Sequence, residues 1–281
     1  MSWSVVARKD FQDAIRSRGL IAMTILFTLL YAGAAYVYTF IGSSSPQAAS
    51  VLSLISFLLL PATILVPIVG VFAGYRAIAG ERETGSIKLL LGLPHTRQDV
   101  VIGKIVGRSS VVTVSTFVGF LVAAVVAAVL YSSFPAVDFV AFGALTVLFA
   151  LAFVGIGVGI SAATGSTTKA IAGGFGVFLL FQFLWGEIPK LINYIANGSY
   201  GFSGRQPNWS YLFEQLDPQN AYQLAVNEWV VQSPLREALY QQVFGGDPPL
   251  FFSPWFALAV LLAWVLVPAG LGYLAFERAD L

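Results

Sequence analysis

The hydrophobic positions of this chain fall into six long apolar stretches separated by polar segments. The stretches cover residues 19–41, 51–75, 100–131, 137–163, 170–185 and 255–276. A helix needs roughly 20 apolar residues to cross about 30 Å of hydrocarbon, and the fifth stretch falls short of this unless it continues toward Ile195. The pattern predicts an all-α integral membrane protein, with six transmembrane helices in a single transmembrane domain over residues 1–281.

Local signals refine this picture. Pro61 and Pro67 lie inside the second stretch. Each leaves a backbone carbonyl without its helical hydrogen bond, and neighbouring helices have to satisfy it, so we expect this helix to be packed internally. Thr96 and Asp99 precede the third stretch at capping-box spacing, which marks a helix start. The fourth stretch contains small residues that permit close helix contact. Its glycines include Gly155, Gly157 and Gly159.

A polar leader, residues 1–18, precedes the first stretch. Val5, Val6, Phe11 and Ile15 alternate there with charged residues, which predicts a short amphipathic helix. Such a helix can lie in the headgroup layer of the membrane. It can equally be a charged anchor that only sets the orientation of the chain, and the pattern does not separate these two interpretations.

The longest polar segment, residues 186–254, separates the last two stretches. It contains two motifs in which an N-cap residue precedes proline at the first helical position. The motifs are Asp217-Pro218 and Ser233-Pro234. They predict two short helices, over residues 219–231 and 235–244. We expect this segment to be an extracytoplasmic helical loop that covers the outer mouth rather than an independent domain.

Composition supports the membrane interpretation and excludes several kinds of chemistry. Hydrophobic residues make up 57% of the chain and charged residues 10%, whereas soluble domains have about 45–50% and about 25%. The absence of cysteine excludes disulfides and thiolate sites. A net charge of +1 gives no indication of nucleic-acid binding. We therefore expect the lipid bilayer, and no nucleic acid, to surround the protein.

The distribution of basic residues predicts the orientation. Twelve of the fifteen Lys and Arg residues lie on the same side as the N-terminus, and the other three lie in the long 186–254 segment. Basic residues in short segments favour the cytoplasmic side. We therefore expect a multi-pass protein of the plasma membrane, with both termini and the segment of residues 76–99 in the cytoplasm.

Candidate catalytic groups are scarce. The six stretches contain almost no ionisable residues, which argues against a proton relay, and Asp138 lies at the outer start of the fourth. The single His95 lies in a surface turn without a partner carboxylate at a useful spacing, so we interpret it as a solvated or interface residue. No phosphate-binding loop occurs. We expect no catalytic, metal or cofactor site, and any energy for transport has to come from another polypeptide.

The 76–99 segment carries the densest structural signals. Ile87, Leu90 and Leu91 recur at helical spacing after an acidic start, which predicts a short helix over residues 81–93. One interpretation is a connector between the second and third spans. The other is a rigid lever that a cytosolic partner can push.

At these residues the chain resembles the membrane subunits of type-2 ABC transporters, also called ABC exporter permeases. The central resemblance is carried by residues 81–91 (ERETGSIKLLL), Leu93-Pro94, Arg97 and Gly103-Lys104. Two weaker matches are the leader, with Ala7-Arg8-Lys9-Asp10-Phe11 and Arg16-Ser17-Arg18, and the outer pattern Leu216-Asp217-Pro218 with Ala221-Tyr222. Within this family the chain is most similar to permeases of the nitrous-oxide-reductase maturation system. With one His, two Met and no Cys, it lacks the ligands that a copper cargo would need.

The resemblance implies a half-transporter that is not itself an enzyme. Two permease chains would pair as a homodimer, and each would engage a cytosolic ABC ATPase subunit that binds the ATP. The helix over residues 81–93 would couple ATP hydrolysis to movement of substrate, in the direction of export. The implied coupling residues are Glu81, Arg82, Glu83, Thr84, Gly85, Lys88, Leu90, Leu91, Pro94 and Arg97. Gly85 would allow close approach of the partner.

Two other classes of function compete with this one. A membrane-embedded hydrolase would need a Ser–His or paired-Asp arrangement at membrane depth, and the sequence offers neither. A membrane docking or signalling protein would use the same 76–99 segment to bind a partner that is not an ATPase. Identification of the partner discriminates between the last class and a transporter.

Overall fold

The structure, a computed structural model, describes residues 3–15, 18–42, 51–131 and 133–280. The sequence GSSSP of residues 42–46 predicts a turn after the first stretch, but it falls largely outside the described residues. The Arg16-Ser17 pair of the leader motif also falls outside them. Every regular element within the described residues is helical, which confirms the predicted all-α class.

Six helices in the described residues are long and apolar enough to cross a membrane, as predicted. The fifth is α8 extended by a short π-helix, and it ends at Leu184 instead of continuing toward Ile195. The spanning helices are α2 (Arg18–Gly42), α3 (Val51–Gly74), α6 (Arg97–Leu130), α7 (Ala136–Ala163), α8 (Thr167–Leu179) with η1 (Leu180–Leu184), and α13 (Pro254–Glu277). The predicted capping box is present at the start of α6. The Thr96 side chain accepts a hydrogen bond from the Asp99 backbone N–H, and the Asp99 side chain accepts one from the Thr96 backbone N–H.

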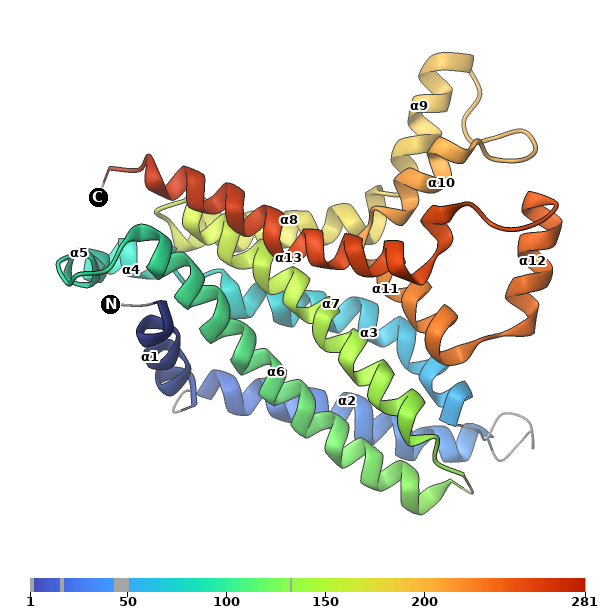
Figure 1. The fold of residues 1–281 in the computed structure, drawn as a ribbon, viewed down its shortest axis with the longest axis horizontal. Helices are drawn as coiled ribbons and strands as arrows, with labels where there is room; N and C mark the ends of the chain where they lie inside the picture. The colour runs from blue at the N-terminus through green and yellow to red at the C-terminus, as the bar shows by residue number, and fades with distance from the viewer. Residues whose placement is uncertain (1–2, 16–17, 43–50, 132, 281) are drawn as a thin grey trace.

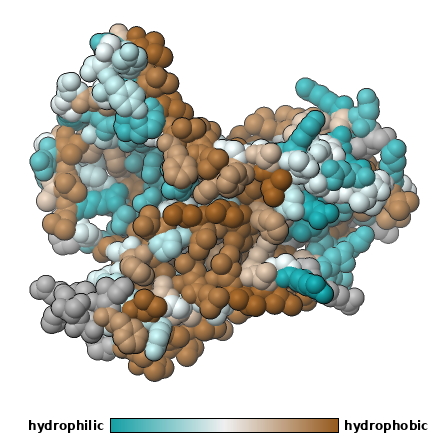
Figure 2. Space-filling view, turned by 180° about the vertical axis from the view of Figure 1, so that it is seen from behind, coloured by the Kyte–Doolittle hydropathy of each residue, from teal (hydrophilic) through white to brown (hydrophobic). Residues whose placement is uncertain are grey.

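The spanning helices lie side by side along the long axis of the molecule (Figure 1). Both chain ends, the leader helix α1 (Trp3–Ile15) and the short helices α4 (Ala79–Thr84) and α5 (Ser86–Leu91) gather at one end. A broad apolar surface covers the middle of the molecule, and hydrophilic side chains gather toward the two ends (Figure 2). This distribution matches a bundle whose middle lies in hydrocarbon.

Helix α7 lies at the centre of the bundle and packs against α3, α6, α8 and α13. Its contacts are close because its glycines meet backbone rather than side chains. A Cβ on Gly155 would meet the carbonyl oxygen of Val265 in α13, and one on Gly159 would meet that of Pro268. On the opposite face, a Cβ on Gly157 would lie 2.9 Å from the carbonyl oxygen of Val71 in α3. The close helix contact predicted for these glycines is confirmed.

Helix α3 is packed internally, as its prolines predict. In its most apolar 18-residue window 61% of the residues are buried, the same share as in α7 and more than in any other spanning helix of the described residues. Gly70 and Gly74 of α3 face the backbone of α7 so closely that neither position has room for a Cβ. Helices α3 and α7 therefore form the tightly packed middle of the bundle.

The segment between the last two spans contains more structure than the sequence indicates. The two predicted helices exist, as α11 with η2 and as α12, whereas α9 and α10 were not predicted. The bounds are α9 (Glu187–Asn197), α10 (Asn208–Gln215), α11 (Pro218–Val226), the π-helix η2 (Asn227–Val231), α12 (Pro234–Phe244) and the 3₁₀-helix η3 (Leu250–Phe252). Asp217 caps α11 by accepting a hydrogen bond from the Gln219 N–H at 2.8 Å, but Ser233 makes no such side-chain bond.

Within this segment, helix α11 is buried against the bundle, where it packs on α7 and α13. The Tyr222 ring stacks on Phe149 at 4.4 Å, and its hydroxyl lies 2.8 Å from the Thr146 hydroxyl of α7. Trp264 of α13 donates its indole N–H to the Leu216 carbonyl at 2.8 Å. The sequence PQNAYQLAV is too polar to be recognised as a membrane segment from hydropathy. Its position in the bundle is determined by tertiary contacts.

We expect Gly159→Ala to destabilise the protein, because its methyl group would collide with the α13 backbone. Forced overpacking of this kind costs about 1–3 kcal/mol. Gly270→Ala, in α13, is the matched control, since a Cβ there meets nothing within 4 Å. The measurement is the thermal unfolding of the purified protein in lipid nanodiscs. Equal melting temperatures for the two variants would contradict the proposed packing of α7 on α13.

Candidate functional site: the 76–99 segment and its charge cluster

The 76–99 segment forms two short helices, α4 and α5, and not the single helix predicted over residues 81–93. The break is at Gly85, whose backbone is left-handed with φ of +75°. A left-handed residue commonly ends a helix, and glycine adopts this conformation without the steric penalty of a Cβ. Nothing lies within 4 Å of the place where its Cβ would be. The geometry therefore gives Gly85 a backbone role, as the turn between two helices.

Helix α5 rests on the bundle through its apolar face, as the spacing predicts. Ile87 is buried, and Leu90 and Leu91 are half-buried against the hydrophobic core. Leu89 lies on the other side of the helix and is 80% exposed. A leucine exposed beside the charged Lys88 gives this face an apolar contact surface with a basic neighbour.

The leader helix α1 packs along α6. The sequence left open whether the leader lies in the headgroup layer or only sets the orientation of the chain. Val6, Ala7, Asp10 and Ala14 form its buried face. Close approach is possible because Gly103 of α6 faces Val6 and Gly107 faces Asp10. A Cβ at these glycines would lie 2.6 Å from the Val6 Cβ and 2.8 Å from the Asp10 Cβ. The leader therefore belongs to the helical bundle, with one face buried against protein.

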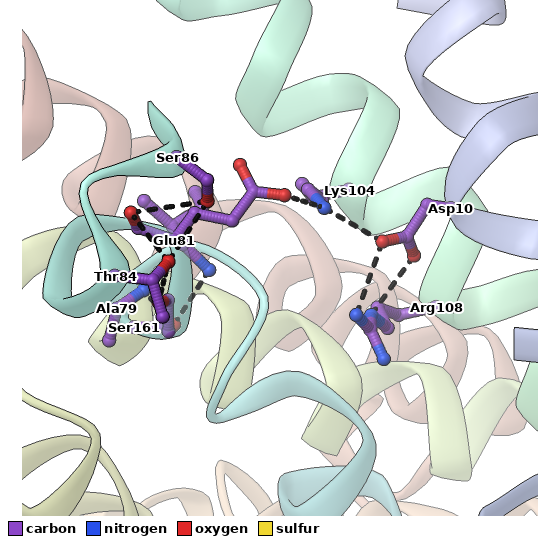
Figure 3. Close-up of polar contacts among 10 residues, drawn as sticks. Asp10, Ala79, Glu81, Thr84, Ser86, Lys104, Arg108 and Ser161 are labelled. Carbon is purple, nitrogen blue, oxygen red and sulfur yellow. Dashed lines mark hydrogen bonds and ion pairs between the residues drawn. The ribbon is translucent and has the colours of Figure 1, made fainter. Parts of the chain in front are cut away.

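Four charged residues from three helices meet where α1, α4 and α6 come together (Figure 3). The Lys104 ammonium of α6 lies between two carboxylates, 2.8 Å from Asp10 of α1 and 2.5 Å from Glu81 of α4. Arg108, one turn further along α6, pairs with Asp10 at 3.0 Å. We call Asp10, Glu81, Lys104 and Arg108 the charge cluster.

Burial makes the charge cluster a strong structural constraint. The side chains of Asp10 and Lys104 are 3% and 9% exposed. A charge buried this deeply is strongly destabilising when its partner is removed. Two acidic and two basic groups balance each other, so the three helices are stable together and costly to separate. The sequence contains these residues, but Asp10 and Lys104 are 94 positions apart, and no spacing rule connects them.

Two further contacts fix α4 to the bundle. At its start, the Ser161 hydroxyl of α7 accepts hydrogen bonds from the backbone N–H groups of Ile78 and Ala79, at 3.0 and 2.9 Å. Near its end, the Glu83 carboxylate accepts hydrogen bonds from the backbone N–H and the hydroxyl of Thr167, at 2.8 and 2.7 Å. Thr167 is the first residue of α8, where a carboxylate is favoured by the helix dipole. Helix α4 is thus bonded to α6, α7 and α8.

The end of the segment is bound to the last span. Arg97 donates hydrogen bonds to the carbonyl oxygens of Phe276, Glu277 and Ala279, at 2.5, 2.7 and 2.9 Å. These carbonyls lie at the C-terminal end of α13, where a cation is favoured. The guanidinium groups of Arg82 and Arg97 also lie over the Phe276 ring, at 6.0 and 5.4 Å from its centroid.

The ten coupling residues implied by the resemblance fall into two sets. Side chains of the first set contact other helices of this chain or the hydrophobic core. They are Glu81, Arg82, Glu83, Leu90, Leu91 and Arg97. The second set, Thr84, Gly85, Lys88 and Pro94, is exposed at the surface. The sequence did not identify Asp10, Arg108 and Ser161 as parts of the site; only its Gly-x-x-x-Gly spacing at Gly103 and Gly107 could have indicated a docked helix.

We expect Asp10→Asn to lower the free energy of unfolding by about 3 kcal/mol, the lower end of the cost of breaking a buried ion pair, because Glu81 still pairs with Lys104. Helix α1 should also become more susceptible to proteolysis. Asp13→Asn, an exposed position on the same helix, is the control. The measurements are equilibrium unfolding and limited proteolysis. If both variants behave like the parent protein, the charge cluster does not fix α1.

Comparison with known proteins agrees with this geometry. Over residues 4–281 the chain matches the family described as "ABC-2 family transporter protein". It is 28% identical over 281 residues to "Probable ABC transporter permease protein NosY" of Stutzerimonas stutzeri, with 98% of each chain covered. It is 29% identical over 233 residues to the protein of the same name from Pseudomonas aeruginosa, with 79% of this chain and 80% of the relative covered.

The family match covers the leader, the 76–99 segment and all six spans, and both relatives are named as permeases. The resemblance to ABC transporter permeases is thereby confirmed. The chain belongs to the ABC-2 family of transporter proteins and is a membrane-embedded subunit of an ABC transporter.

Proposed function

We propose that this permease couples ATP hydrolysis by a separate cytosolic ATPase subunit to substrate export, with the 76–99 segment as the mechanical link. The observation that carries this proposal is the set of bonds made by the segment. It is connected to α1 and α6 by the charge cluster, to α7 by Ser161, to α8 by Glu83 and to α13 by Arg97. A displacement of the segment is therefore transmitted to four spanning helices at once.

The proposal assigns the two sets of coupling residues different roles. Glu81, Glu83 and Arg97 hold the segment to the bundle. The exposed residues of the second set, together with Leu89 and Leu93, contact the ATPase. Leu89 and Leu93 are 80% and 55% exposed, so a partner that covers them would remove apolar surface from water, which favours association. Lys88 beside them favours an acidic site on the partner.

The arrangement of the whole transporter is also part of the proposal. Both termini and the 76–99 segment lie at one end of the molecule (Figure 1), and the distribution of basic residues favours the cytoplasm for that end. The chain would lie in the plasma membrane as a homodimer, with one ATPase subunit bound to each copy. ATP would bind to the ATPase, and this chain would carry no cofactor and perform no catalysis.

We expect Leu89→Glu to reduce the amount of ATPase that co-purifies with the tagged permease about tenfold, as loss of a central interface contact does. Leu250→Glu is the control, because Leu250 is 88% exposed but lies in the segment between the last two spans. The measurement is quantitative co-purification in mild detergent, followed by an assay of ATP hydrolysis. Unchanged co-purification of the ATPase with the Leu89 variant would contradict the role of Leu89 in the interface, and a partner without ATPase activity would favour the docking or signalling class instead.

We expect Glu83→Gln to leave the ATPase bound but to weaken the response of α8 to ATP. A charge-assisted hydrogen bond is about twice as strong as a neutral one, so the response should fall by about half or more. The chain contains no cysteine, so Gly176→Cys, at an open position of α8, provides a single labelling site. The measurement is the rate of maleimide labelling with and without ATP.

Glu187→Gln, which removes a carboxylate near the other end of the molecule, is the matched control for the Glu83 variant. It should leave the ATP-dependent change in labelling unaltered. A full response in the Glu83 variant, with the ATPase still bound, would contradict transmission through α4 and α8.

A further inference from the structure

A polar cavity of about 480 Å³ lies between α3, η1 and α11. Its volume falls within the range of about 300–1,000 Å³ that is usual for small-molecule sites. Polar side chains from all three elements line it. Those that the argument needs are Ser56 and Thr63 of α3, Gln182 of η1, and Asp217, Gln219 and Asn220 at the start of α11.

The start of α11 lies at membrane depth. Leu216, which precedes the helix, is bonded to Trp264, the eleventh residue of α13, and Tyr222 is bonded to Thr146, the eleventh residue of α7. With a rise of 1.5 Å per residue, each contact lies about 15 Å from the end of its spanning helix, which is half of the roughly 30 Å of hydrocarbon that such a helix crosses. Burying polar groups at that depth costs free energy, and groups found there commonly have a function.

The hydrogen bonds of the lining leave mostly acceptors available. Ser56 and Thr63 donate their hydroxyl protons to the carbonyl oxygens of Leu52 and Leu60, at 3.1 and 2.8 Å. Asn220 donates an amide N–H to the Glu214 carbonyl at 2.9 Å. The oxygens of these three side chains remain able to accept. A ligand that donates several hydrogen bonds would fit them.

Two buried amide atoms of the lining have no hydrogen-bond partner in the described structure. They are the Gln182 Oε1 and the Gln219 Nε2. Gln219 is 5% exposed, and leaving a polar group unpartnered at such a position is destabilising. The first atom is an acceptor and the second a donor. A ligand that satisfies both needs at least one hydrogen-bond donor and one acceptor.

Asp217 gives the cavity its charge. It is 3% exposed, and none of the described residues that line the cavity is Lys, Arg or His. A carboxylate buried without a counterion is destabilised. A cationic ligand would supply the missing positive charge, whereas an anion would be repelled.

We propose that this cavity binds a small organic cation, with a primary ammonium group facing Asp217 and the Gln182 carbonyl, and with an acceptor facing the Gln219 amide. The proposal rests on the proposed function in that the bound molecule would be the cargo. A bare metal ion fits poorly, because the described residues contain no group of three or more His, Cys, Asp or Glu that could hold one. The lining selects for charge and hydrogen-bond donors.

The test uses three probes with the same carbon chain: 4-amino-1-butanol as the cation, 1,4-butanediol as its neutral counterpart, and 4-hydroxybutanoate as the anion. Their binding to the purified full-length permease in nanodiscs is measured by calorimetry, without ATPase. We expect the cation to bind about tenfold or more tightly than the diol, as one charge-assisted hydrogen bond provides. The anion should bind most weakly.

Asp217→Asn is the deciding variant, because asparagine keeps the oxygen that caps α11 and is as good an N-cap. We expect it to remove the preference for the cation while leaving the affinity for the diol unchanged. Asp247→Asn, an exposed position in the same segment, should retain the preference. A parent protein that binds the cation and the diol equally, or an Asp217 variant that keeps its preference at an unchanged melting temperature, would overturn the proposal.

The outcome is independent of the test of the proposed function, since that test measures ATPase co-purification and this one measures the permease alone. Loss of ATPase binding in the Leu89 variant together with equal binding of cation and diol would support the proposed function and contradict the cation site. Unchanged ATPase binding in the Leu89 variant together with preferential binding of the cation would support the cation site and contradict the proposed coupling interface.

Discussion

The requirement that buried charges be paired determines how this protein is organised at one end. Lys104 is nearly inaccessible to water in the structure, and it is stable there because Asp10 and Glu81 approach it from two different helices. Each carboxylate brings its own helix with it, since removing either one leaves two basic groups and only one acidic group in the cluster. The leader, the segment between α3 and α6, and α6 itself therefore form one unit. The remaining contacts of that segment extend the unit to α7, α8 and α13.

The middle of the bundle is held together differently. There, α7 packs on α3 and α13 by backbone contact at glycines, so its stability comes from close fit and dispersion rather than from charge. Such contacts tolerate little sliding, and the helices that share them move as a body. The two modes have different roles under the proposed function: ion pairs would hold the segment to its helices, and close packing would carry a displacement along them.

Much of the fold could be predicted, because hydropathy and local capping depend on neighbouring residues. The six spans, the Thr96–Asp99 capping box and the glycine contacts of α7 are of this kind. The break at Gly85 was missed because helical spacing continues across it, and nothing in a single sequence distinguishes a glycine within a helix from one that ends it. The burial of α11 and the charge cluster depend on partners tens of residues away, which local patterns cannot identify.

The turn at Gly85 has a consequence for how such proteins can diversify. Helix α4, before the turn, is bound by polar contacts to three spans, whereas α5, after it, rests on the bundle by apolar contacts among the described residues. Under the proposed function, the polar contacts that hold α4 to the spans therefore precede the turn, and the exposed residues Lys88 and Leu89, which recognise the partner, follow it. Exchange of α5 between related permeases would change partner choice while the contacts of α4 with the spans stay intact. The turn therefore marks a natural junction for chimeric transporters.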